Sequence, residues 1–243
     1  MGTCTQAWQT IVTAINAQLT TNNNSPQSMT AYDLYPRFLV SVDCVIFGFK
    51  NGKLQVLIHQ RPYEPGKGEL SLIGGFVQKD ESLDDAAKRI LRLFTGMDHV
   101  YMQQMSAYGE VERDPGERVI SIVYYALANM EEAECALHDN VEAEWVDVDQ
   151  LPQLCLDHND MVEKARQIIG ESFMAKPVGK YLMPRYFTLS LLQSLYESIL
   201  GTQIDKRNFR RSISDKDYIK ATSMIDKGSS RRGATLYEYT QLH

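Results

Sequence analysis

Apolar and polar positions in the first part of the chain repeat with the periods of strands and of one helix. Apolar residues dominate 38–49 and 54–61, and Asn51-Gly52 between them is typical of a two-residue hairpin turn. A third strand is expected at 69–77, where it runs into a double glycine. The stretch 82–96 has helical spacing, with Ser82 as N-cap and Gly96 as the stop.

The pattern continues with strands expected at 105–113, 118–128 and 141–148 and a helix at 160–169. Strands interleaved with helices predict an α/β (α+β) fold, with a mixed sheet between helices, in a domain that spans 37–175. Residues 1–36 precede it. Their apolar positions predict a helix at 5–20, followed by a linker rich in asparagine.

The pattern changes after a stretch at 174–186 that contains Pro177 and Pro184 and is interpreted as a linker and hinge. An amphipathic helix is expected at 188–200, capped by Thr188. Asp205 caps a second helix, and strands follow at 218–227 and 233–240. Helix, turn, basic helix, strand, wing and strand is the order of a winged helix, so 176–243 is predicted to be a winged helix-turn-helix domain.

The charge is distributed unevenly. The chain carries a net −6, but residues 1–175 carry −12 and residues 176–243 carry +6. A basic C-terminal domain predicts a polyanionic partner. No apolar run reaches the roughly 18 residues of a membrane span, and no signal peptide is evident. The four cysteines have no metal-ligand spacing, so we expect a cytoplasmic protein with no metal, no cofactor and no membrane partner.

Cationic side chains of the second helix and of the turn between the last strands are the candidates for contacts to double-stranded DNA. In a major groove, arginine reads guanine and asparagine reads adenine. The competing interpretation is a solvated basic helix, or a scaffold that contacts RNA or protein. The DNA-binding candidates are Lys206, Arg207, Asn208, Arg210, Arg211, Arg231 and Arg232.

The stretch from Gly75 to Met97 resembles the Nudix box. Glu81 and Arg89 stand at the intervals of that motif, and Gly96-Met97 closes it. The later segments ERDPGERVISIVYYAL and LPQLCLDHNDMV are similar to the branch of the family that handles ADP-ribose. The resemblance spans roughly residues 38–170 and implies a Nudix-type α/β/α sandwich.

Three positions depart from the box in a way that bears on chemistry. The helical glutamates that hold divalent metal in the family correspond to Ile90, Leu93 and Phe94. These side chains offer no oxygen ligand to a hard cation, so no catalytic residue is assigned and no hydrolysis is expected. An active nucleoside-diphosphate hydrolase is the alternative. The helix is apolar on nearly all sides and is expected to be buried, with its former metal face against the N-terminal helix or a second subunit. The alternative is a ligand pocket whose wall has become apolar.

Without catalysis, the sheet cleft of this domain is expected to bind a small-molecule effector. Charged residues there are usually solvated, so each assignment competes with a plain surface role. The effector is a neutral sugar or an ADP-ribose-like molecule. His59 is one of the polar residues that could point into the cleft, but it is interpreted as a structural or surface residue. The effector-binding candidates are Asp43, Arg61, Lys67, Glu69, Phe76 and Glu110.

The Nudix-like body followed by PRYFTLSLLQSLYESILG and DKRNFRRSI is similar to the Nudix-related transcriptional regulators. That resemblance implies a homodimer that binds a palindromic operator, represses without effector and leaves DNA when the effector binds. Some members sense ADP-ribose and control NAD metabolism. Others accompany sugar catabolism, and this chain is similar to an L-arabinose-responsive repressor branch. The sequence itself leaves repressor and activator open.

Overall fold

The structure is a computed structural model that describes residues 30–98, 100–131, 143–173, 177–228 and 233–240. The helix expected at 5–20 and its linker lie outside these ranges. The chain divides into two units, Met1–Phe38 and Leu39–His243. In the first unit the short 3-10 helix η1 (Ala31–Leu34) follows Thr30, whose backbone N–H donates to Asp33 Oδ2 at 2.8 Å.

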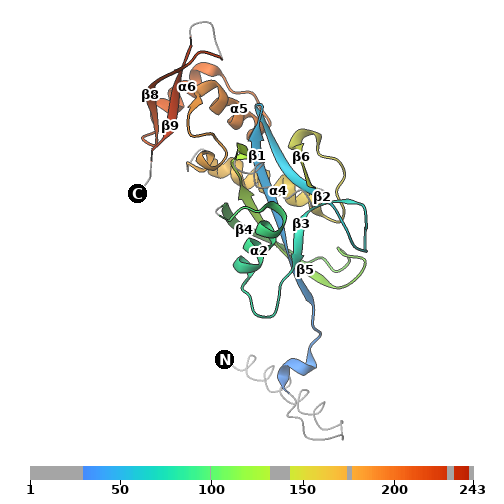
Figure 1. Ribbon diagram of the computed structural model, residues 1–243. Helices are drawn as coiled ribbons and strands as arrows, with labels where there is room; N and C mark the ends of the chain where they lie inside the picture. The colour runs from blue at the N-terminus through green and yellow to red at the C-terminus, as the bar shows by residue number, and fades with distance from the viewer. Residues whose placement is uncertain (1–29, 99, 132–142, 174–176, 229–232, 241–243) are drawn as a thin grey trace, which may run out of the picture. The chain divides into compact units, whose positions relative to one another are not determined.

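A six-stranded mixed sheet forms the body of the second unit, in the order β4-β5-β1-β3-β2-β6 (Figure 1). The central strand β1 pairs in parallel with β5 and antiparallel with β2 and β3. Asn51 and Gly52, with φ of 54° and 78°, form the predicted two-residue turn. The strands are β1 (Leu39–Lys50), β2 (Lys53–Gln60), β3 (Leu70–Phe76), β4 (Tyr101–Tyr108), β5 (Val119–Leu127) and β6 (Ala143–Asp147).

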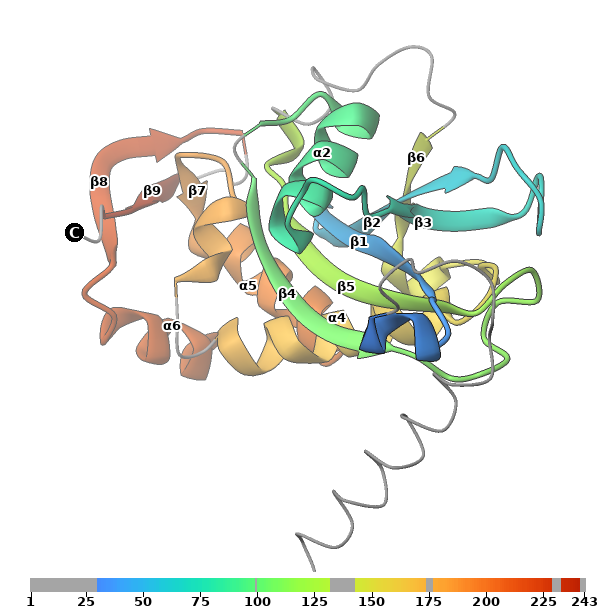
Figure 2. The ribbon, with the colours of Figure 1, turned by 90° about the horizontal axis from the view of Figure 1, so that it is seen from below.

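Side chains of β1 alternate between two apolar layers, because successive residues of a strand point to opposite faces. Cys44 and Ile46 pack with α2 (Leu83–Thr95), and Val45 and Phe47 pack with α4 (His158–Phe173). The two helices lie on opposite sides of the sheet (Figure 2). The predicted α/β/α sandwich is confirmed. A short 3-10 helix, η2 (Val148–Gln150), follows β6.

The C-terminal part is a winged helix. It comprises β7 (Phe187–Thr188), α5 (Leu189–Leu200), α6 (Lys206–Ser214), β8 (Ile219–Asp226) and β9 (Ala234–Tyr239), with the sheet order β7-β9-β8. Thr188 caps α5, since its side chain accepts from the Leu191 N–H at 3.1 Å, and Gly201 (φ 64°) ends the helix. Strand β7 was not predicted, because its partner β9 lies about 50 residues later in the chain.

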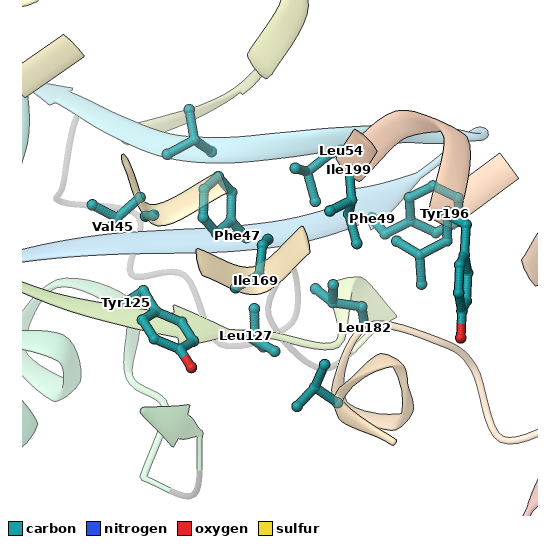
Figure 3. Packing of buried hydrophobic residues seen from close by; sticks show 14 of the residues in the cluster. Val45, Phe47, Phe49, Leu54, Tyr125, Leu127, Ile169, Leu182, Tyr196 and Ile199 are labelled. Atoms are coloured by element: carbon teal, nitrogen blue, oxygen red, sulfur yellow. The ribbon is translucent and has the colours of Figure 1, made fainter. Parts of the chain in front are cut away.

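One apolar core runs from the sheet into the winged helix. Figure 3 shows Phe49 and Leu54 of the β1–β2 hairpin beside Tyr196 and Ile199 of α5. The core also takes in Leu182, which follows the 3-10 helix η3 (Val178–Tyr181). The sequence predicts a linker at 174–186. The described part of this stretch is packed, because its apolar side chains, including Leu182, belong to the core.

One expected strand has the wrong bounds. The strand predicted at 105–113 begins at Tyr101 and ends at Tyr108. The residues after it form a loop, in which the Arg118 guanidinium donates to the carbonyls of Gly109 and Glu110 at 2.7 and 2.8 Å in place of a strand partner. In α2, Leu93 is 63% exposed, and the partners expected to cover this helix, the N-terminal helix or a second subunit, lie outside the residues that the structure describes.

Candidate functional site

A cleft of about 290 Å³ opens at one end of the Nudix-type sheet. The N-terminal half of β1, the end of β3 and the loop at 61–65 supply three of its sides. The loop after β4, the turn before α4 and side chains of β2 and α2 supply the rest. Asp43, Arg61 and Phe76, three of the expected effector-binding residues, line it. Lys67, Glu69 and Glu110 are on neighbouring loops or strand ends and do not.

The floor of the cleft is polar and buried. Asp43 is 7% exposed, and the Ser121 hydroxyl donates to its Oδ2. His158 places Nε2 4.0 Å from Asp43 Oδ1, while its Nδ1 accepts from the Leu72 N–H at 3.1 Å. Because Nδ1 serves as an acceptor, the ring proton belongs on Nε2, which faces the carboxylate. A Cβ on Gly74 would lie 2.1 Å from Asp43 Oδ1, so only glycine leaves room for this carboxylate.

A buried ion pair fixes one wall. Arg113 donates to both oxygens of Asp157, at 2.8 and 2.5 Å, and the arginine side chain is only 3% exposed. Across the cleft, Arg61 Nε donates to the Pro65 carbonyl at 3.0 Å. Arg113 and His158 line the cleft and were not among the sequence candidates. The segments ERDPGER and LCLDHND that contain them carry the family resemblance, but no spacing rule joins an arginine to an aspartate 44 residues away.

Aromatic rings form the side of the cleft next to α2. Phe94 lines the cleft, and its ring meets the His59 ring edge-on with centroids 5.1 Å apart. Burial lowers the pKa of His59, so this imidazole is neutral near pH 7. His59 is buried rather than at the surface, and it also lines the cleft.

The Nudix-box residues do not fit a divalent cation. Ile90 is buried against Gly75, Phe94 faces His59, and Leu93 points to solvent. Glu81 accepts two hydrogen bonds from Arg89, at 2.8 and 2.6 Å, and this guanidinium holds the pKa of Glu81 at about 2. Within the described ranges no three acidic, histidine or cysteine side chains group as metal ligands would.

Helix α6 presents a cationic surface. Phe209 and Ile213 are buried, and the ring of Phe209 meets that of Tyr196 edge-on at 5.2 Å. Asp205 caps the helix by accepting from the Arg207 and Asn208 N–H groups at 3.1 and 2.9 Å. Arg231 and Arg232 lie outside the described residues. The exposed candidates on the helix are Lys206, Arg207, Asn208, Arg210 and Arg211.

Family models account for both parts of the chain. Residues 37–168 match the NUDIX domain, and residues 179–239 match the NrtR DNA-binding winged helix domain. The chain is also 35% identical over 211 residues to the ADPR responsive transcriptional repressor NtrR of Acinetobacter baylyi, in a match that covers 84% of this chain and 83% of the relative.

The chain belongs to the NrtR family of Nudix-related transcriptional regulators. A crystal structure of Shewanella oneidensis NrtR complexed with a 27mer DNA has the same fold, with a TM-score of 0.73, 28% identity and coverage of 83% of this chain and 93% of that one. An ADP-ribose pyrophosphatase of Methanocaldococcus jannaschii is 32% identical over 138 residues, 56% of this chain and 78% of the relative. In the described part of this NrtR-family chain, no helix is long and apolar enough to cross a membrane.

Proposed function

We propose that this chain is a transcriptional repressor that binds operator DNA through α6 and responds to an ADP-ribose-like effector in the Nudix-type cleft. One observation carries the proposal. The same chain joins an exposed cationic helix in a winged-helix domain to a Nudix-type domain with a ligand-sized cleft, and this domain has Ile90, Leu93 and Phe94 at the metal-binding positions of the box. A domain of this kind binds a ligand without hydrolysing it, because the metal that would stabilise developing charge has no ligands.

The effector is best matched by ADP-ribose. The Acinetobacter relative is described as ADPR responsive, and the Methanocaldococcus relative acts on ADP-ribose. Two guanidiniums, those of Arg61 and Arg113, line the cleft and supply positive charge near a pyrophosphate. Phe76 and Phe94 offer apolar faces for a base or a ribose.

L-arabinose is the second candidate, and one observation favours it. The floor of the cleft offers a buried carboxylate, that of Asp43, beside the Nε2–H of His158. An acceptor next to a donor suits the hydroxyls of a neutral sugar. The relatives reported above give a sugar effector no support, so we place ADP-ribose first.

The operator contact is assigned to the exposed residues of α6, with Arg231 and Arg232 of the wing on the phosphate backbone. We further propose that the protein acts in the cytoplasm as a homodimer on a palindromic site. A two-fold protein matches a two-fold operator, with half-sites one helical turn or a multiple apart. The domain limits 37–175 and 176–243 are part of this proposal.

The test is a thermal-shift screen of the full chain with ADP-ribose, NAD and L-arabinose, each with and without magnesium. A ligand that binds only the folded state raises the midpoint by mass action. We expect a shift with ADP-ribose that is independent of magnesium. A shift with L-arabinose alone would mean that L-arabinose, and not ADP-ribose, is the effector. A magnesium-dependent shift with phosphate release would mean that the protein is a hydrolase.

The DNA arm uses a random-sequence duplex library, from which the full chain selects its site. We expect an inverted repeat, and we expect the ligand found in the screen to raise the Kd for that duplex about tenfold or more. No selection of duplex DNA would overturn the regulatory function.

A further inference from the structure

We propose that helix α4 couples the cleft to the winged helix, with Asp157 at the cleft end and Arg166, near the middle of α4, as the residue that contacts the winged helix. The inference rests on the proposed function and assigns the route by which an effector in the cleft reaches α6. Three groups of contacts support it: those at the start of α4, those along its buried face, and those of Arg166 near its middle.

The N-terminal end of α4 is part of the cleft wall. Leu156 lines the cleft with φ at 53°, a left-handed conformation that is unfavourable for a non-glycine residue. The turn is held in that conformation by the ion pair between Asp157 and Arg113 and by the bond from the Leu72 N–H to His158. A ligand that engages Arg113 or His158 therefore acts on the residues that fix the start of α4.

Because α4 is packed along its length, a movement at its N-terminal end moves the whole helix. Met161, Val162, Ala165 and Ile169 are buried in the core that also contains the buried residues of α5. A close-packed helix moves as a body, because packed interiors do not deform continuously. Nine residues separate Asp157 from Arg166, which is about 14 Å of helix at 1.5 Å per residue.

The far contact is made by one side chain. Arg166 Nε donates to the Ile199 carbonyl at 3.0 Å, and its Nη2 donates to the Ser198 carbonyl at 2.6 Å. These carbonyls belong to the last turn of α5, where the helix itself provides no donors. Arg166 Nη1 also pairs with Asp149 at 2.8 Å. The guanidinium thus ties α4 and the sheet domain to the C-terminal end of α5.

The end of α5 in turn positions α6. Glu197 accepts from the Ile204 N–H at 2.9 Å across the turn between the two helices. The edge-on contact of Tyr196 with Phe209 fixes the buried face of α6. A shift of the last turn of α5 therefore changes the orientation of the cationic face of α6.

The ligand-free test is a double-mutant cycle on the full chain, read by hydrogen–deuterium exchange in peptides that cover 199–214. Asp157→Asn weakens the cleft end, and Arg166→Gln removes the far contact. We expect Asp157→Asn to raise exchange in these peptides about threefold or more in the wild-type background and to have no such effect in Arg166→Gln. Equal effects in both backgrounds, or none in either, would overturn the route.

Two further variants keep this test decisive. The pair Arg113→Gln and Asp157→Asn removes the ion pair that holds the same turn without leaving one charge unpaired, and it replaces Asp157→Asn if that variant fails to fold. Lys164→Gln is the matched control, because it removes one charge from α4 at a residue that donates to Ser106 of β4 and not to α5. We expect Lys164→Gln to leave exchange at 199–214 unchanged, and a rise equal to that of Asp157→Asn would also count against the route.

The effector arm uses ADP-ribose and the selected duplex. Arg166→Gln is expected to bind ADP-ribose within about twofold of wild type, while the effect of ADP-ribose on the DNA Kd falls below about twofold. Full retention of that effect would overturn the role of Arg166. If wild type does not bind ADP-ribose, the proposed effector fails, and the exchange cycle still decides the coupling.

Discussion

The ring of Phe94 lies edge-on to the imidazole of His59, with 5.1 Å between the ring centroids. Phe94 stands where the Nudix box has a metal-binding glutamate. A position that supplies a ligand in the enzymes therefore supplies an apolar wall here, and His59 behind it is kept neutral by burial.

Returning a carboxylate to this position should destabilise the fold without restoring chemistry. Phe94→Glu places a charge beside a half-buried aromatic contact, and we expect a loss of roughly 2 kcal/mol or more in the free energy of unfolding. Urea unfolding measures this loss. Magnesium-dependent release of phosphate from ADP-ribose should stay at background, because Ile90 and Leu93 still provide no ligands.

Leu93→Glu is the matched control for this loss. Leu93 is 63% exposed on the same helix, so the same substitution there should change the free energy of unfolding by no more than about 0.5 kcal/mol. Equal losses in the free energy of unfolding for the two variants would show that any glutamate on this side of α2 is destabilising, and that the contact of Phe94 with His59 is not the cause.

The helices and strands of this fold were predictable where the residues that determine their limits are close together in the sequence. The Asn51-Gly52 turn, the caps Ser82, Thr188 and Asp205, and the stop at Gly96 act within a few residues, and the structure has each of them. β4 was misplaced because its partner β5 determines its limits. The stretch 105–113 looks extended, but side-chain bonds from Arg113 and Arg118 make its second half a loop.

The cleft was predictable only in part, for the same reason. Asp43, Arg61 and Phe76 were found because they adjoin the strands that the pattern predicts. Lys67 and Glu69 lie close to them in sequence but are exposed outside the cleft. Arg113 and His158 were missed because the contact that brings them together, with Asp157, joins segments that only the folded sheet places side by side.

The Glu81–Arg89 pair predicts a defined pH dependence. The pKa of Glu81 falls from its ordinary value of 4.5 to about 2 in the folded protein. A depressed carboxyl pKa adds stability that is fully present above about pH 4.5 and is lost as the pH falls through about 2. Glu81→Gln should therefore unfold at a lower temperature than wild type at pH 7, and the gap in Tm should close on acidification. If the difference in Tm stayed constant down to pH 2, the loss of stability in Glu81→Gln would come from packing and not from the ion pair.

The winged helix should depend on one buried aromatic side chain. Phe209 is 3% exposed and contacts Tyr196, so Phe209→Ala leaves a cavity and should cost about 3–5 kcal/mol. Hydrogen exchange in α6 should rise first, and duplex DNA binding should be lost. Met224→Ala in the same domain is the control, because a partly exposed methionine on β8 contributes little to this core.

Arg210 and Arg211 should contribute to DNA binding and not to effector binding. Both are exposed on α6, away from the buried face of Phe209 and Ile213. Replacing the pair with alanine should weaken binding of the selected duplex at least tenfold and reduce the salt slope by about 1 for each phosphate that is no longer neutralised, while the thermal shift with effector stays unchanged. Lys88→Ala with Arg92→Ala removes the same charge from α2 and should leave affinity within about twofold. If the α6 pair left affinity unchanged, α6 would not be the recognition helix.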